Sequence, residues 1–166
     1  MNTPEAVLTA RTLLGPLTPL QSDCGRLCGG ACCQGDEQTG MLLFPGEDAL
    51  YAGCDFARVL RAGFSLGGEE ARLLVCRGTC RREERPLACR LFPLFLRFGA
   101  QGSPRVALDP RARAVCPLAR AGLRGLDPDF VRGAVRAVRI LAGDAQIEAF
   151  LRRWSEIEAE FRRPLF

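Results

Sequence analysis

Apolar positions at helical spacing predict helices near both ends of the chain. The first is amphipathic and runs from Pro4 to about Leu14, where Gly15-Pro16 ends it. Near the other end, Asp127-Pro128 has the form of a helix cap followed by a first helical residue. The apolar positions that follow at this spacing are Phe130, Ala134, Ala137 and Leu141.

A second C-terminal helix is predicted after Gly143, with Asp144 as its cap. Its apolar stripe consists of Ile147, Phe150, Leu151, Trp154, Ile157 and Phe161. Charged residues occupy the opposite face, so the stripe is expected to pack into the core. Residues 127–163 are therefore predicted to form a helical hairpin.

The middle of the chain is predicted to combine short strands with one helix. Strands are expected at Met41 to Phe44, Ala71 to Val75, Leu91 to Phe98 and Arg105 to Leu108, and a helix from about Glu47 to Arg61. The last two strands flank a turn-rich connection and predict a short β-hairpin. Pro93 places the first of them at an edge or a bulge. Together these elements predict an α+β fold.

The length of 166 residues suits one domain over residues 1–166, because a chain of this size can bury a core without covalent cross-links. The sequence begins without a basic leader before an apolar run. It also lacks the 18 or so consecutive apolar residues of a membrane span. We therefore expect a cytoplasmic protein with no membrane partner, in a compartment where thiols stay reduced.

Cysteine is the residue type that points to chemistry. The chain has nine cysteines and no histidine. Eight of them fall into two sets, which are Cys24, Cys28, Cys32 and Cys33, followed by Cys76, Cys80, Cys89 and Cys116. Their number is odd and their density is below that of a small disulfide scaffold, so metal binding is favoured over disulfides. Buried structural cysteines or a vicinal disulfide remain the alternatives for the first set.

The first set lies in a glycine-rich segment, 23–40, that predicts a loop able to fold around a ligand. Side chains of adjacent residues in extended backbone point to opposite sides, so Cys32 and Cys33 are poorly placed to share one tetrahedral site. Either of them is free to ligate a second centre or to remain a spare thiol. Cys54 stands apart and is predicted to be a small buried residue on a helix face.

The motifs CxxxCxxxCC, RPLACRLFP and a final cysteine before proline resemble the YkgJ-like cysteine-cluster family of zinc- or iron-chelating domains. The resemblance covers about residues 20–120. It implies metal binding through all eight clustered cysteines. The chain departs from the family pattern between Cys80 and Arg85, where the family usually has an aromatic residue and this chain has only arginine and glutamate.

The formal net charge is +4, and residues 69–124 hold 12 arginines against five acidic residues. A zinc ion or an oxidised 4Fe-4S cluster with four thiolates carries a charge of about −2. Two such centres would cancel the formal net charge of +4. We therefore expect Arg81, Arg82, Arg85 and Arg90 to offset thiolate charge or lie on a solvated surface, and we do not expect nucleic acid as a partner. Arg85 and Arg90 flank Cys89 and are candidates to bond cluster sulfurs or carbonyls, or to pair with Glu83 and Glu84.

Stand-alone catalysis is not expected. Without histidine the chain cannot form the common histidine-assisted nucleophile or metalloprotease sites, and it has no nucleotide-binding loop. Two interpretations remain. The favoured one is an iron–sulfur protein, 4Fe-4S by preference, with a redox, sensing or carrier role and a protein redox or client partner. The alternative is a zinc protein whose metal is structural or supports interactions.

Overall fold

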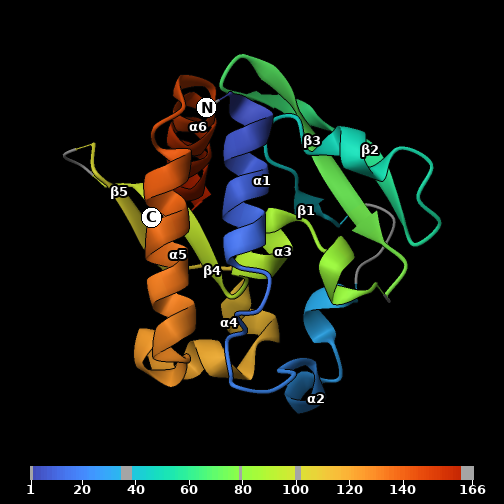
Figure 1. Cartoon of the computed structure of the whole chain (residues 1–166), viewed down its shortest axis with the longest axis vertical. Coiled ribbons are helices and arrows are strands. Elements are labelled where there is room, and N and C mark those ends of the chain that lie inside the picture. The colour runs from blue at the N-terminus through green and yellow to red at the C-terminus, as the bar shows by residue number, and fades with distance from the viewer. Residues whose placement is uncertain (1, 35–38, 79, 100–101, 162–166) are drawn as a thin grey trace.

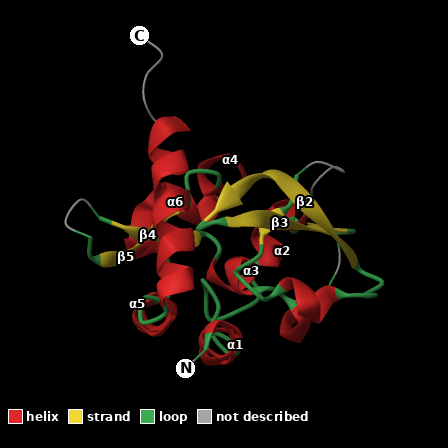
Figure 2. Ribbon diagram, turned by 90° about the horizontal axis from the view of Figure 1, so that it is seen from above, coloured by secondary structure: helices red, strands yellow, loops and turns green. Residues whose placement is uncertain are grey.

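The computed structural model describes residues 2–34, 39–78, 80–99 and 102–161. These residues form an α+β fold, as predicted. Three long helices pack beside two small antiparallel sheets (Figure 1). Figure 2 shows helices α1 and α5 side by side, end-on, on the same side of the two sheets. Helix α2 (Gly25–Cys28) lies below α1 in Figure 1, and α3 (Leu87–Leu91) lies beside the lower part of α1.

Helix α1 (Thr3–Leu13) confirms the first predicted helix. The side chain of Asn2 accepts a hydrogen bond from the Glu5 amide, and the Glu5 carboxylate accepts one from the Asn2 amide. This reciprocal pair satisfies two amides that have no partner within the helix. The helix ends where Gly15-Pro16 was expected to stop it.

Helices α5 (Pro128–Leu141) and α6 (Ala145–Phe161) form the predicted hairpin. The Asp127 carboxylate accepts hydrogen bonds from the amides of Asp129 and Phe130, at 2.8 and 3.2 Å. Asp144 does the same for the Ile147 amide at 3.0 Å. Residues 162–163 of the predicted hairpin and the side chain of Phe161 lie outside the described part of the chain.

The larger sheet has the strand order β1-β3-β2, and its strands are β1 (Met41–Leu42), β2 (Ala57–Leu66) and β3 (Glu69–Cys76). Strands β2 and β3 are joined at Gly67-Gly68, where both residues have positive φ. A side chain at Gly67 would meet the Phe150 backbone at 2.7 Å, so only glycine fits there. The strands at 41 and 71 were predicted.

The predicted helix from Glu47 to Arg61 is wrong. The structure has a short 3-10 helix, η2 (Asp48–Tyr51), followed by strand β2. Most of β2 is exposed or half-buried, because β2 is an edge strand. An exposed strand has no clear alternation of apolar and polar residues, so pairing with β3 decided its conformation.

The second sheet is the predicted hairpin of β4 (Leu94–Phe98) and β5 (Pro104–Leu108). Its first strand begins later than expected, because Leu91 belongs to the short helix α3 (Leu87–Leu91). Pro93 precedes the strand, and its carbonyl accepts the Asp109 amide at 2.9 Å. Residues 100–101 of the predicted connection lie outside the described residues.

One main core joins α1, α3, the second sheet, α5 and α6. The side chains of Phe44, Phe95, Phe150 and Trp154 form an aromatic group inside it, with neighbouring ring centroids 5.3–6.3 Å apart. A smaller cluster of Leu43, Tyr51, Ala57 and Leu74 lies under η2. Among the described residues, the buried members of both clusters include none of the cysteines. No helix in the described part of the chain is long and apolar enough to cross a membrane.

Candidate metal centre

The eight clustered cysteines come from four parts of the chain, and the fold brings them to adjoining positions. In the first group, Cys24 precedes helix α2 (Gly25–Cys28), which ends at Cys28, and η1 (Ala31–Cys33) carries Cys32 and Cys33. Cys76 is the last residue of β3, Cys80 precedes the 3-10 helix η3 (Arg82–Glu84), and Cys89 lies in α3. Cys116 lies between α4 (Ala112–Val115) and η4 (Pro117–Gly125).

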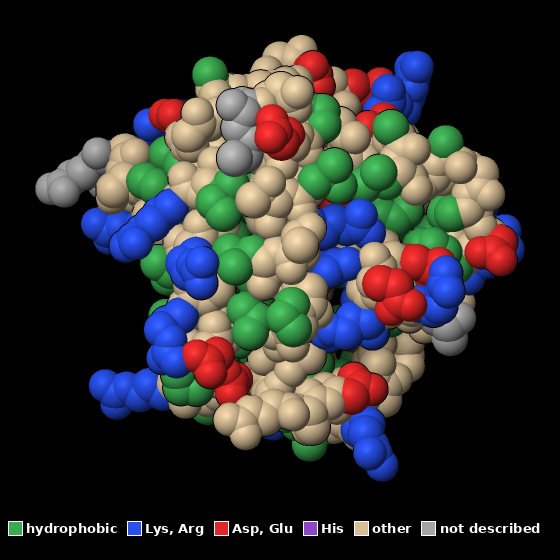
Figure 3. Space-filling model, in the orientation of Figure 1, with side chains coloured by type: hydrophobic (Ala, Val, Ile, Leu, Met, Phe, Trp, Pro, Cys, Tyr) green, Lys and Arg blue, Asp and Glu red, His purple; other side chains and the backbone are tan. Residues whose placement is uncertain are grey.

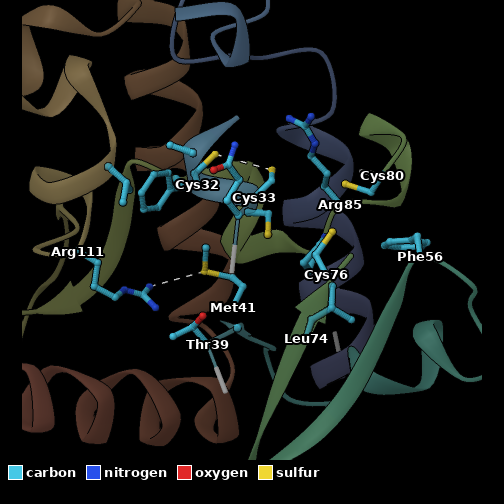
Figure 4. Close-up of a pocket in the computed structure, with 17 residues that line it drawn as sticks. Cys32, Cys33, Thr39, Met41, Phe56, Leu74, Cys76, Cys80, Arg85 and Arg111 are labelled. Carbon is cyan, nitrogen blue, oxygen red and sulfur yellow. Dashed lines mark hydrogen bonds between the residues drawn. The ribbon is translucent and has the colours of Figure 1, made fainter. Parts of the chain in front are cut away.

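Two adjoining pockets divide these thiols. One pocket, of about 320 Å³, is lined by Cys32, Cys33, Cys76, Cys80 and Cys89 (Figure 4). The other, of about 40 Å³, is lined by Cys24, Cys28, Cys32, Cys89 and Cys116. Cys32 and Cys89 reach both pockets.

We assign the two shared thiols from the neighbours whose charges shift the pKa of each cysteine. Besides burial, the charges of Cys116 and Cys28 raise the pKa of Cys24. The pKa of Cys32 is raised most by its hydrogen-bonded neighbour Cys33, then by burial, and less by Cys28 and Cys24. Cys89 is affected by Cys33, Cys80 and Cys76. We call Cys24, Cys28, Cys32 and Cys116 the Cys116 set, and Cys33, Cys76, Cys80 and Cys89 the Cys76 set. Tertiary structure therefore exchanges one member between the two groups that are contiguous in the sequence.

Cys32 and Cys33 are the point where the two sets meet. Their sulfur atoms are 3.9 Å apart, yet Cys32 is exposed while Cys33 faces the larger pocket near Cys76 and Cys80 (Figure 4). Among the described residues, no three cysteine, aspartate, glutamate or histidine side chains converge closely enough to hold a metal ion in this conformation. Holding a metal ion would require these neighbouring thiols to move closer together.

Burial favours the neutral form of most of these thiols. It raises the pKa of Cys24, of Cys80 and, most strongly, of Cys89. Cys33 differs, because a hydrogen bond from the Cys32 thiol lowers its pKa, burial opposes this, and the Arg85 guanidinium lowers the pKa further. Metal binding would have to displace protons from these sulfurs, which makes it dependent on pH.

The segments that carry the thiols have little hydrophobic support of their own. Helices α2, η1 and η3 contain no buried residue. By contrast, α3 is attached to the main core through Leu87, Ala88 and Leu91. Helices this short are marginal in water, so something other than apolar burial must hold this region in place.

Arginine side chains connect these segments through backbone carbonyls. Arg90 donates to the carbonyls of Arg85, Arg11 and Glu83, at 3.0, 3.0 and 2.8 Å. Arg82 donates to the carbonyls of Gly15 and Leu17. Basic side chains gather in a strip on the face shown in Figure 3. Of the partners considered for Arg90, the structure shows backbone carbonyls.

The expected surface ion pair is made by another arginine. Arg81 pairs with Glu84 at 2.6 Å and lies 3.9 Å from Glu83, all on the surface. Arg85 instead faces the cysteines, next to Cys80 (Figure 4). The four arginines therefore differ in their surroundings: Arg81 pairs on the surface, Arg82 and Arg90 bind carbonyls, and Arg85 lies beside the thiols.

Glu47 is a residue of the site that was not predicted from the sequence. It is 1 % exposed, and its carboxylate accepts the amides of Leu87 at 2.7 Å and Phe44 at 3.2 Å. Leu87 begins the helix that carries Cys89, so Glu47 joins the core to the site. Arg11 lies 3.9 Å away. No sequence signal marks Glu47, because its partners are backbone amides brought close only by folding.

Glu47 predicts a pH dependence of stability. Burial raises the pKa of Glu47 to about 7, although the two amides and Arg11 oppose the shift. The folded chain then keeps a proton that the unfolded chain loses above its pKa of about 4.5. The free energy of unfolding should fall as pH rises from about 4.5 to about 7, by up to about 3 kcal/mol, and stay level above that.

Urea unfolding at a series of pH values measures this fall. A Glu47→Gln variant, which cannot ionise, serves as the control and should lack it. Parallel pH profiles for the wild type and the variant would contradict the prediction.

Cys54 is separate from the eight, as predicted, but its surroundings differ from the expected helix face. It follows η2 in irregular backbone and is half-buried. Its thiol donates to the Ala57 carbonyl at 3.3 Å and packs against the smaller cluster. Local packing accounts for this cysteine.

Comparisons with protein-family models, curated proteins and solved structures give no match to this chain. The resemblance to the YkgJ-like family, drawn from the cysteine and RPLACRLFP motifs, therefore stays a prediction. The function has to be inferred from the fold and the two cysteine sets.

Proposed function

We propose that this protein binds metal through its eight clustered cysteines, with an iron–sulfur cluster, 4Fe-4S by preference, serving a redox, sensing or carrier role. The observation that carries the proposal is the meeting of eight thiols from four parts of the chain around two adjoining pockets, which share Cys32 and Cys89. All-sulfur sets of four suit both iron–sulfur clusters and zinc. Two separate sets also explain why Cys32 and Cys33 are adjacent, because each of them then belongs to a different set.

In this proposal the Cys116 set and the Cys76 set each hold one centre. An iron–sulfur cluster, when bound, supplies one-electron redox chemistry whose potential depends on hydrogen bonds to sulfur and on exposure. The chain itself supplies thiolates, orients four of them from short helices and, through one of these helices, anchors Cys89 to the core. Neither set, as defined, includes a histidine or a carboxylate ligand.

Structural zinc is the second candidate, and one observation favours it. Helices α2, η1 and η3 bury no residue of their own, and structural zinc commonly organises segments that lack a core. In that case the sites would support folding or interactions, without redox change. Both candidates require the same eight sulfurs.

A carrier or redox role also needs a surface that a partner protein can reach. Cys32 is exposed, and the apolar side chains of Leu27 and Val115 beside the smaller pocket are 57 % and 36 % exposed. We propose that a protein redox or client partner approaches the Cys116 set here. The cytoplasm, where thiols remain reduced, is the proposed location, and nucleic acid is not a proposed partner.

Anaerobic purification followed by metal and sulfide analysis tests the proposal. An iron–sulfur protein should be brown, with broad absorption near about 400 nm that bleaches on reduction or exposure to air. Zinc is redox-silent, so a zinc form should be colourless and unchanged by dithionite. Stoichiometric zinc without iron in protein from iron-replete cells would select the second candidate. Metal-free protein with an unchanged fold and all thiols titratable would refute both.

A further inference from the structure

Arg85 occupies a position unlike that of the other arginines near the site. Among the described residues, it is the one cation that lines both cysteine pockets, together with their shared thiols Cys32 and Cys89. It therefore lies between the Cys116 set and the Cys76 set. Figure 4 shows its side chain beside Cys80, on the side of the pocket that also holds Cys76.

The backbone of Arg85 is held firmly. Its carbonyl accepts hydrogen bonds from Arg11 and Arg90, both at 3.0 Å. Pro86 follows and restricts the conformation at this point. The guanidinium therefore extends from a fixed point, which limits the positions it can reach.

The side chain of Arg85 retains an unused donor. Its Nε is buried and is without a hydrogen-bond partner among the described residues. A buried donor left unpaired costs free energy, so such a group in a native site calls for an acceptor. The nearby acceptors that metal binding would create are thiolates of Cys33, Cys80 and Cys89.

The pKa shifts of Arg85 and of its neighbouring thiols agree with a position between the two sets. Burial lowers its pKa, but the nearby thiols of Cys80, Cys33 and Cys89 raise it overall. Arg85 in turn lowers the pKa of Cys24, a member of the other set, against the dominant effect of burial. One guanidinium thus acts on thiols of both sets.

We infer that Arg85 is a positioning residue shared by both cysteine sets, donating N–H···S hydrogen bonds that hold their thiolate ligands in place and reduce repulsion between the two centres. The inference rests on the proposed function. A planar guanidinium with five N–H donors suits this task, because it can donate hydrogen bonds to acceptors on two sides at once. Each centre with four thiolates is an anion, so a shared cation favours the occupancy of both.

The test uses holoprotein purified without oxygen and challenged with EDTA, with metal release followed over time. Cys28→Ser disables the Cys116 set and Cys76→Ser disables the Cys76 set, so each background reports on the other set alone. Adding Arg85→Gln should accelerate metal release about 10- to 100-fold in both backgrounds, the range typical of lost outer-shell contacts to metal ligands. Arg81→Gln, which removes an exposed arginine paired with glutamates, should change neither rate.

Two further measurements separate positioning from general destabilisation. The metal–thiolate absorption should shift in Arg85→Gln protein that still holds metal, because hydrogen bonds to sulfur change the energy of that transition. Arg85→Lys keeps the charge without the planar fork, so it should recover only part of the retention time. If Arg85→Gln fails to fold, Arg85→Lys in the same two backgrounds should still accelerate release from both sets.

The possible results are distinct. Faster release from only one set would overturn the sharing of Arg85, and unchanged release from both would overturn its role altogether. Wild-type protein that binds no metal would instead refute the proposed function, and the inference with it.

Discussion

Cys89→Ser is expected to empty the Cys76 set and to open the cysteine segments while the main core stays folded. Cys89 lies in α3, which is attached to the core, and neighbours three other thiols of its set. A serine hydroxyl is a poor ligand for zinc or an iron–sulfur cluster, so total metal content should fall by about half if each set holds one centre. Structural zinc in small domains contributes an apparent 10–16 kcal/mol or so, which is an upper limit for the loss of stability here.

Metal analysis and amide hydrogen exchange check this result together. The buried residues of the core include no cysteine among those described, so amides of α1, α5 and α6 should remain protected. Amides of α2, η1 and η3 should exchange faster, because those helices bury no residues of their own. We therefore expect the variant to speed amide exchange in α2, η1 and η3 and to leave it unchanged in α1, α5 and α6.

Cys54→Ser is the matched control, since Cys54 packs locally and donates to the Ala57 carbonyl. A serine can keep that hydrogen bond, and metal content should be unchanged. Equal metal loss in the Cys54 and Cys89 variants would show that the assignment of ligands is wrong.

Phe150→Ala should lower the free energy of unfolding by about 3–5 kcal/mol, the range for removing a buried aromatic side chain. Phe150 is 3 % exposed, and its ring centroid lies 5.3 Å from that of Phe44 and 5.6 Å from that of Trp154. Its loss leaves a cavity at the centre of the aromatic group. Trp154 is the only tryptophan, so its fluorescence reports the unfolding transition directly.

Phe64→Ala provides the comparison on the surface. Phe64 is 41 % exposed on strand β2, and its removal should change stability by about 0.5 kcal/mol or less. Metal content of folded Phe150→Ala protein should match that of the wild type, because the aromatic group and the cysteine sets are separate. A loss below about 1 kcal/mol for Phe150→Ala would mean that the core closes over the cavity.

Helices and strands with clear local sequence signals were predicted correctly from the sequence. The apolar stripe of α6 and the caps at Asp127 and Asp144 predicted the C-terminal hairpin, because a helix of this length satisfies its own backbone and needs only one apolar face. Four strands and the first helix were predicted for similar reasons. Strand β2 was not predicted. Its own residues show no clear alternation of apolar and polar positions, and pairing with β3 decided its conformation.

Clustering and residue type by themselves established which thiols are candidates for metal binding, and that no histidine takes part. Tertiary structure alone placed Cys33 with Cys76, and Cys116 with Cys24, because side-chain direction and chain crossing are not encoded in spacing along the chain. It also placed the carboxylate of Glu47 against the first amide of α3 and Arg85 between the two sets. Such contacts join residues tens of positions apart, and they exist only once the core has brought their segments together.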